Sequence, residues 1–164
     1  MGLKDNVKQT YIQLLIDSLG KKNEVLTELM QITTKQQDII DSESFDEDEF
    51  LRTISLKEEQ IKDLTEFDKG FEMVYERIRE ELNNNPNSYR TEIEDLKELV
   101  TKVTDLSVKL QALEKRNKSK IEPLLVSKRK NIKNARLSNE TVTNYYKSMS
   151  GKQEEQSYFY DKKN

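Results

Sequence analysis

The sequence predicts an all-α protein, an antiparallel, coiled-coil-like bundle of three long helices over residues 1–136, with a disordered C-terminal tail over residues 137–164. Apolar residues recur at steps of three, four or seven along three long segments, which is the period of helices with one buried face. Only 4 Gly and 2 Pro among 164 residues leave few turns. Charged residues make up 36% of the chain and apolar residues 34%, a balance typical of long solvated helices rather than of sandwiches or α/β folds.

The first helix is predicted over residues 3–41. Its apolar side chains fall on one face, so that the helix has a single stripe to bury. The polar run Asp41–Ser44 then ends the periodic pattern. The stripe consists of Leu3, Val7, Tyr11, Leu15, Leu19, Leu26, Leu29 and Ile40.

The second helix is predicted over residues 47–83. Asp46 fits an N-cap, because its carboxylate can accept a hydrogen bond from the backbone N–H three residues later, at Glu49. Phe45 and Phe50 flank this cap at the spacing of a hydrophobic staple, which fixes the direction in which the chain enters the helix. The stripe consists of Phe50, Ile54, Ile61, Leu64, Phe71, Tyr75, Ile78 and Leu82.

The third helix is predicted over residues 88–136, after a run of Asn and Pro at residues 83–87 that signals a reversal. Ser88 is placed to cap it. Pro123 removes one backbone donor and crowds the preceding turn, so we expect a kink or an interruption near it. Beyond residue 136 the periodic pattern is lost and Ser, Asn, Thr and Lys dominate, which predicts a flexible tail. The stripe consists of Tyr89, Ile93, Leu96, Val100, Val103, Leu110, Ile121 and Leu124.

The three stripes can be placed in register. Short loops make neighbouring helices antiparallel, so the numbers of facing residues have a constant sum. A sum of 90 aligns the first two stripes and a sum of 171 aligns the second with the third. The polar interruptions then coincide in layers, which either fix the register, as in coiled coils, or allow one end to open for a ligand. One layer contains Thr33, Lys57 and Glu114, and the next contains Gln36, Ile54 and Asn117.

The composition excludes most catalytic chemistry. The chain has no Cys, His or Trp, so it can form neither a cysteine–histidine zinc site nor a nucleophile activated by histidine. We therefore expect neither an enzyme nor a bound metal or cofactor. The chain lacks the roughly 20 consecutive apolar residues of a membrane span, and Asp5 interrupts the N-terminal stretch where a signal peptide needs an apolar run. These features predict a cytoplasmic protein without stable membrane insertion.

Charge is distributed unevenly along the chain. Residues 43–86 hold 14 acids and 6 bases, whereas residues 87–136 hold 7 acids and 13 bases, so the second and third helices attract each other. The basic stretch of the third helix raises the alternative of nucleic-acid binding. The overall charge of −3 and the absence of aromatic residues within that stretch argue against it.

Two further segments are candidate binding surfaces. Near the end of the third helix an apolar stripe runs past the reach of the first helix, and such an exposed amphipathic segment suits a contact with a partner helix. The alternative is that it folds back on the bundle or self-associates in a homodimer. The tail carries aromatic residues in polar surroundings, a pattern found in docking peptides. The stripe consists of Ile121, Leu124, Leu125, Ile132 and Leu137, and the aromatic residues include Tyr145, Tyr146, Tyr158 and Tyr160.

Several short motifs resemble the FlgN-type flagellar export chaperones over nearly the whole chain. These motifs are Leu14-Leu15 in the first helix, Lys57-Glu58-Glu59 in the second, Asn117 ahead of Leu124-Leu125 in the third, and Tyr160-Asp161-Lys162-Lys163 in the tail. The resemblance implies a cytoplasmic chaperone that binds hook–filament junction proteins of the FlgK and FlgL type. Such a chaperone prevents their premature assembly and delivers them to the flagellar type III export gate.

The resemblance also implies where the two partners bind. Cargo binding would fall on the C-terminal helical region, here residues 121–137, and one of the four tail tyrosines would dock to the export-gate component FlhA. The alternatives are a FliT-type chaperone for the filament cap and a structural coiled-coil subunit that oligomerises without a cargo.

Overall fold

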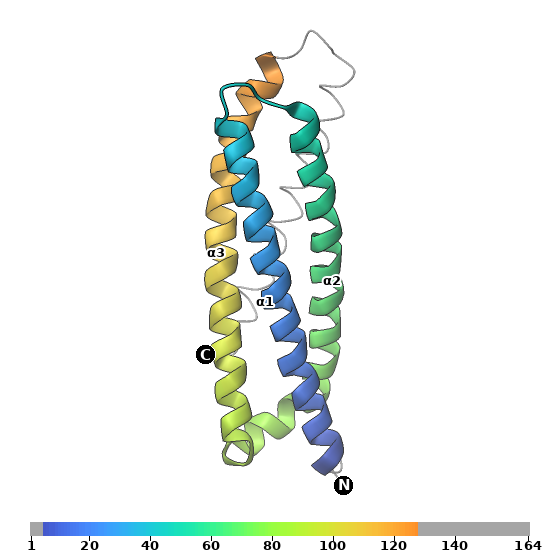
Figure 1. Ribbon diagram of the computed structural model, residues 1–164. Helices are drawn as coiled ribbons and strands as arrows, with labels where there is room; N and C mark the ends of the chain where they lie inside the picture. The colour runs from blue at the N-terminus through green and yellow to red at the C-terminus, as the bar shows by residue number, and fades with distance from the viewer. Residues whose placement is uncertain (1–4, 128–164) are drawn as a thin grey trace.

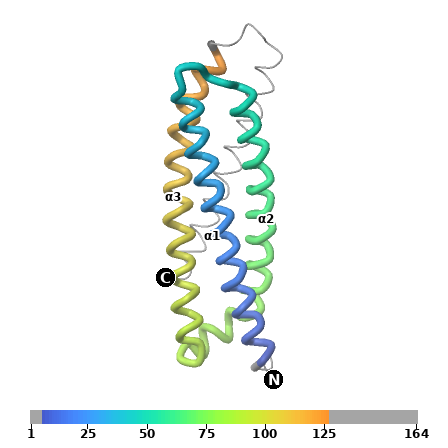
Figure 2. The backbone as a smooth tube through the Cα atoms, viewed as in Figure 1, coloured from blue at the N-terminus to red at the C-terminus, as the bar shows by residue number. Residues whose placement is uncertain are grey.

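The computed structural model describes residues 5–127, which form three long helices (Figure 1). They are α1 (Asp5–Asp41), α2 (Glu47–Asn84) and α3 (Arg90–Ser127), with a short 3₁₀ helix, η1 (Pro86–Tyr89), before α3. Successive helices run in opposite directions, and the described part of the chain contains no strand. The predicted all-α bundle of three long helices is therefore confirmed. The N-terminal end of α1 lies beside the α2–α3 connection, and the α1–α2 loop lies at the far end beside the last turns of α3 (Figure 2).

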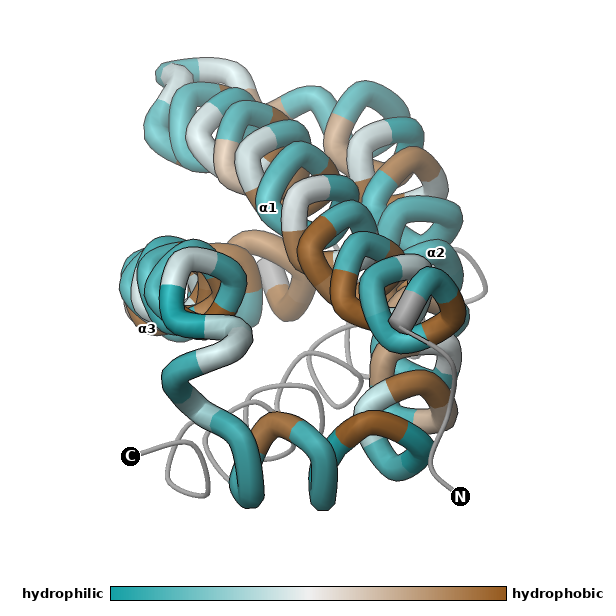
Figure 3. The backbone as a smooth tube through the Cα atoms, turned by 90° about the horizontal axis from the view of Figure 1, so that it is seen from below, coloured by the Kyte–Doolittle hydropathy of each residue, from teal (hydrophilic) through white to brown (hydrophobic). Residues whose placement is uncertain are grey.

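The middle helix of the bundle is α1. It packs along both α2 and α3, whereas α2 and α3 have few close backbone approaches to each other. Figure 3, an end-on view, shows this arrangement, with α2 and α3 on either side of α1. The core is divided into two apolar clusters. The cluster near the α2–α3 connection contains Ile12, Leu15, Leu19, Phe71, Ile78, Leu82, Tyr89, Leu96 and Val100. The cluster near the α1–α2 loop contains Leu26, Leu29, Ile39, Ile40, Phe50, Ile54, Ile61, Leu64, Val103, Leu110, Ile121 and Leu125.

The start of α2 has the predicted cap. Asp46 has an extended backbone (φ −98°, ψ 101°), and its carboxylate accepts a hydrogen bond from the Glu49 N–H at 3.1 Å. The rings of Phe45 and Phe50 lie with their centroids 5.9 Å apart, so the hydrophobic staple is also confirmed. This junction positions the first turns of α2 against the ends of α1 and α3.

The predicted start of the third helix was wrong. Residues 86–89 form η1 with Pro86 in its first turn, the Ser88 N–H donates to the Asn85 carbonyl at 3.1 Å, and α3 begins at Arg90. Arg90 already has helical angles (φ −56°, ψ −49°). The chain thus passes from a 3₁₀ turn directly into α3, and Ser88 lies within that turn rather than in the extended conformation of an N-cap.

The helix continues through Pro123 to Ser127, so the proline does not interrupt α3. Pro123 and Ser119 are both exposed, and water can hydrate the Ser119 carbonyl that loses its helical donor.

None of the helices within residues 5–127 has an apolar stretch of the length that a membrane span requires. The predicted continuation of α3 to residue 136 and the predicted tail, 137–164, lie outside the described residues.

Candidate functional site

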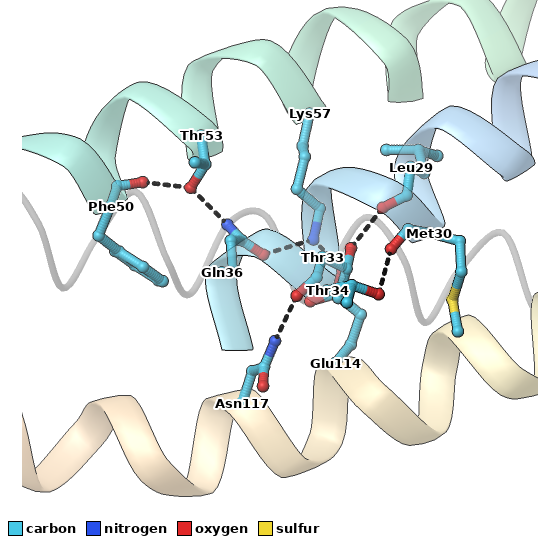
Figure 4. A network of polar contacts seen from close by, with 10 residues as sticks. All are labelled: Leu29, Met30, Thr33, Thr34, Gln36, Phe50, Thr53, Lys57, Glu114 and Asn117. Carbon is cyan, nitrogen blue, oxygen red and sulfur yellow. Dashed lines mark hydrogen bonds and ion pairs between the residues drawn. The ribbon is translucent and has the colours of Figure 1, made fainter. Parts of the chain in front are cut away.

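A layer of polar side chains crosses the apolar core near the α1–α2 loop (Figure 4). All three long helices contribute to it, and each of its six side chains is at most 3% exposed. Buried polar groups are costly unless they are hydrogen-bonded, so the layer has to be satisfied from within. We call this set the polar layer; its members are Thr33, Gln36, Thr53, Lys57, Glu114 and Asn117.

Lys57 of α2 is the centre of the polar layer and is 0% exposed. Its ammonium donates to the Gln36 Oε1 of α1 at 2.7 Å and forms an ion pair with the Glu114 carboxylate of α3. Burial lowers the pKa of Lys57 to about 8, and the Glu114 charge offsets part of that shift. Burial likewise raises the pKa of Glu114, against the opposing effects of Lys57 and Thr33. Desolvation therefore outweighs the attraction between the two charges.

The remaining members add further hydrogen bonds around this pair. Gln36 donates through Nε2 to the Thr53 hydroxyl at 2.9 Å. The Thr33 hydroxyl lies 3.1 Å from Glu114 Oε1, and the Thr33 carbonyl accepts from Asn117 Nδ2 at 3.2 Å. Figure 4 shows these bonds running from α2 through α1 to α3. The polar layer therefore ties each helix to the other two, including α2 to α3.

One more ion pair lies beside the polar layer at the surface. The Arg116 guanidinium donates to the Asp41 carboxylate at 2.7 Å and to the Asn117 side-chain oxygen at 3.0 Å. The Arg116 and Asp41 side chains are 33% and 45% exposed, so we expect this pair to contribute no more than about 1 kcal/mol. It joins the end of α1 to α3 at the level of the α1–α2 loop.

A small apolar group lies between the polar layer and the α1–α2 loop. Its residues belong to the same apolar cluster as the core on the other side of the polar layer, so apolar packing continues past the polar side chains. Phe45 and Leu124 pack against this group as partly buried side chains. We call it the end cap; its members are Ile39, Ile40, Phe50, Ile121 and Leu125.

The end cap contains two of the residues predicted to form an exposed cargo-binding stripe. Ile121 is 0% exposed and Leu125 is 4% exposed, while Leu124 is half-buried, so the prediction of an exposed stripe was wrong for this part of α3. The reason is the offset between the parallel helices α1 and α3. Thr33 lies level with Glu114 and Asn117, which places the last turns of α3 beside the end of α1 and the start of α2. These residues pack against the bundle, as the alternative given in the sequence analysis expects for this segment.

The other predicted site residues lie outside the described residues. Ile132 and Leu137 were expected to continue the stripe. The predicted docking tyrosines are Tyr145, Tyr146, Tyr158 and Tyr160.

A second, partly buried charge pair lies between the two apolar clusters. Lys22 of α1 is 6% exposed and forms an ion pair with Asp68 of α2. Sequence reasoning did not single out this pair, although Asp68 occupies a position in the apolar repeat of α2 and the two residue numbers match the register of the first two stripes. The signal available in the sequence was a charged residue of opposite sign on each of these two facing stripes, at positions whose numbers sum to 90.

The chemistry open to the polar layer is limited. Among the described residues no group of three or more His, Cys, Asp or Glu side chains is arranged to hold a metal ion. Lys57 is enclosed and hydrogen-bonded to Gln36 and Glu114, so a substrate has no access to its amine while the bundle is closed. Comparisons with protein-family models, curated proteins and solved structures find no match to the chain.

Proposed function

We propose that this chain is a cytoplasmic export chaperone of the FlgN type. It binds hook–filament junction proteins of the FlgK and FlgL type, prevents their premature assembly and delivers them to the flagellar type III export gate. The short motifs described above and the three-helix bundle support this proposal. One structural observation carries it: the predicted cargo-binding residues Ile121 and Leu125 lie in an end cap next to the polar layer, at the loop end of the core.

In this proposal the end cap opens to admit the cargo. Movement of the first turns of α2 away from α3 exposes Ile121 and Leu125, and an amphipathic helix of the cargo covers them. Each fully buried side chain of this kind stabilises a complex by about 1.5–3 kcal/mol relative to its exposed state. The same contact hides the apolar surface of the cargo that would otherwise drive its assembly.

The polar layer makes this end the easier one to open. Apolar layers lose their burial when they separate, whereas Lys57 and Glu114 regain hydration that burial denies them. The net cost of opening is therefore lower here than in the cluster of Leu15, Ile78 and Leu96. Because part of the binding energy is used for opening, cargo affinity stays moderate, which suits a partner that must be released. Release at the gate would involve FlhA and one of the tail tyrosines.

A reversible cross-link tests whether opening is required. The chain has no cysteine, so a Gln36→Cys/Thr53→Cys variant carries the only thiols, one on α1 and one in the first turns of α2, at positions whose side chains now lie 2.9 Å apart. A short bis-methanethiosulfonate reagent should hold the first turns of α2 against α1, abolish capture of purified FlgK-type or FlgL-type protein, and lose its effect when a reducing agent is added.

The matched control joins the opposite end of the bundle. Lys8 and Glu81 form an ion pair with 3.1 Å between Nζ and Oε1, and a Lys8→Cys/Glu81→Cys cross-link should leave cargo capture intact. Undiminished capture with the end cap locked would contradict the opening mechanism. Capture of a filament-cap protein instead would favour the FliT-type alternative, and stable oligomers without a captured protein would favour a structural coiled coil.

A further inference from the structure

We propose that the helix entering the opened end cap carries a lysine among apolar residues and that this lysine takes the place of Lys57. This inference rests on the proposed function, because it assumes that a partner helix replaces the first turns of α2. It adds to the proposed function the kind of side chain that the partner helix must present to the polar layer. The argument depends on which helices supply the donor and the acceptors in the polar layer.

The two oxygens that accept from the Lys57 ammonium belong to helices other than α2. Gln36 Oε1 is on α1 and Glu114 Oε1 is on α3, and these residues are 0% and 2% exposed. When the first turns of α2 leave, the donor leaves with them, while the carboxylate and the amide oxygen remain together between α1 and α3. The vacated position is then an acceptor site with apolar residues on either side.

A purely apolar partner helix would fit this position poorly. It would bury the Glu114 carboxylate again without a cation, and an uncompensated buried charge costs far more than a paired one. A lysine meets the geometry, because its single ammonium reaches two oxygens on different helices. Arginine is a worse match, since its planar guanidinium is suited to two oxygens of one carboxylate.

The start of α2 provides the template for the partner sequence. Phe50, Ile54, Lys57 and Ile61 follow one another at steps of four, three and four, and none of them is more than 8% exposed. A cargo helix should therefore carry an apolar residue at position i, a second apolar residue at i+4, lysine at i+7 and a third apolar residue at i+11. This spacing puts all four side chains on one helical face.

A peptide exchange experiment tests the inference without any flagellar protein. The full chain carrying Phe50→Ala has a weakened end cap, and a labelled peptide of residues 46–65 is added to it in trans. A second peptide differs by Lys57→Met alone. Fluorescence anisotropy should show the lysine peptide binding at least tenfold more tightly than the methionine peptide. The preference should disappear when the receiving chain also carries Glu114→Gln.

A gentler variant guards against misfolding of the receiving chain. If circular dichroism shows that Phe50→Ala loses the bundle, Asp46→Ala replaces it, because this change removes only the cap of α2. Equal affinity for both peptides, or binding of neither, would overturn the inference. The cross-linking experiment tests the proposed function separately. If the peptides show no lysine preference but the locked end cap still blocks cargo capture, the inference is wrong and the proposed function stands. If the lysine preference is seen but the locked end cap still captures cargo, the proposed opening is wrong and the lysine site stands.

Discussion

The Lys57 ammonium and the Glu114 carboxylate form an ion pair between α2 and α3, the two helices that have few close backbone approaches. The pair is almost completely removed from solvent, with side-chain exposures of 0% and 3%. It therefore joins two helices that otherwise approach each other closely at few points. Buried pairs of this kind add little net stability but strongly penalise any arrangement that leaves one charge alone.

Loss of the Lys57 charge should destabilise the bundle strongly. Lys57→Met keeps most of the side-chain volume but leaves the buried Glu114 carboxylate without the ammonium, at a cost of about 3–5 kcal/mol. The double variant Lys57→Met/Glu114→Gln should recover at least half of this loss. Urea unfolding followed by circular dichroism measures both. Lys62→Met, at an exposed site on the same helix, is the control and should change stability by no more than about 0.5 kcal/mol.

Stability should depend on pH through the same pair. The pKa of Lys57 is lowered from 10.5 to about 8, so between these values the unfolded chain binds more protons and stability rises with pH. The pKa of Glu114 is raised above 4.5, so the folded chain binds more protons there and stability falls as pH rises through that titration.

Relative to Lys57→Met/Glu114→Gln, the free energy of unfolding of the native chain should therefore be lowest between these two titrations. Urea unfolding of both proteins across the pH range measures the difference. Parallel pH profiles would show that the buried pair does not titrate in this way.

The end cap should open without unfolding of the whole bundle. Hydrogen exchange followed by mass spectrometry should show faster exchange in residues 47–54 and 117–127 than in residues 74–82 and 96–103, because the buried Lys57–Glu114 pair, which regains hydration on opening, lies near the loop. Replacing the pair with Lys57→Met/Glu114→Leu should slow exchange in the end cap. Uniform exchange along all three helices would contradict a separate opening.

Loss of the α2 cap should improve cargo binding while it lowers stability. Asp46→Ala removes the hydrogen bond to the Glu49 N–H and should cost about 1 kcal/mol of stability. If the first turns of α2 must move, the same change lowers the cost of opening and should tighten cargo binding by up to about fivefold. Calorimetric titration with an FlgK-type protein measures this, and Asp63→Ala, at an exposed site on α2, should leave affinity unchanged.

The sequence was sufficient to predict most of the fold, because each element depends on a local or periodic signal. The cap at Asp46, the staple of Phe45 and Phe50, and the turn after residue 83 all act over a few residues. The shared layer of Thr33, Lys57 and Glu114 followed from the register of long antiparallel stripes and is confirmed by direct contacts.

The sequence was not sufficient to predict which helix lies in the middle. Periodicity gives the face that each helix buries but not how closely two such faces approach, so the separation of α2 and α3 was missed. The predicted exposure of Ile121 and Leu125 was wrong for a different reason. The register of the stripes already places Ile121 level with Ile40 and Phe50, so the sequence contained the signal for its burial, and the expectation of an exposed stripe did not use it.

The central place of α1 has a consequence for synthesis of the chain on the ribosome. An α1–α2 hairpin is complete at Asn84, whereas α3 ends at Ser127, 43 residues later. At translation rates of about 5–20 residues per second, the face of α1 that belongs against α3 stays uncovered for roughly 2–9 s. A protein proposed to shield unassembled partners therefore exposes an apolar stripe of its own while it is being made.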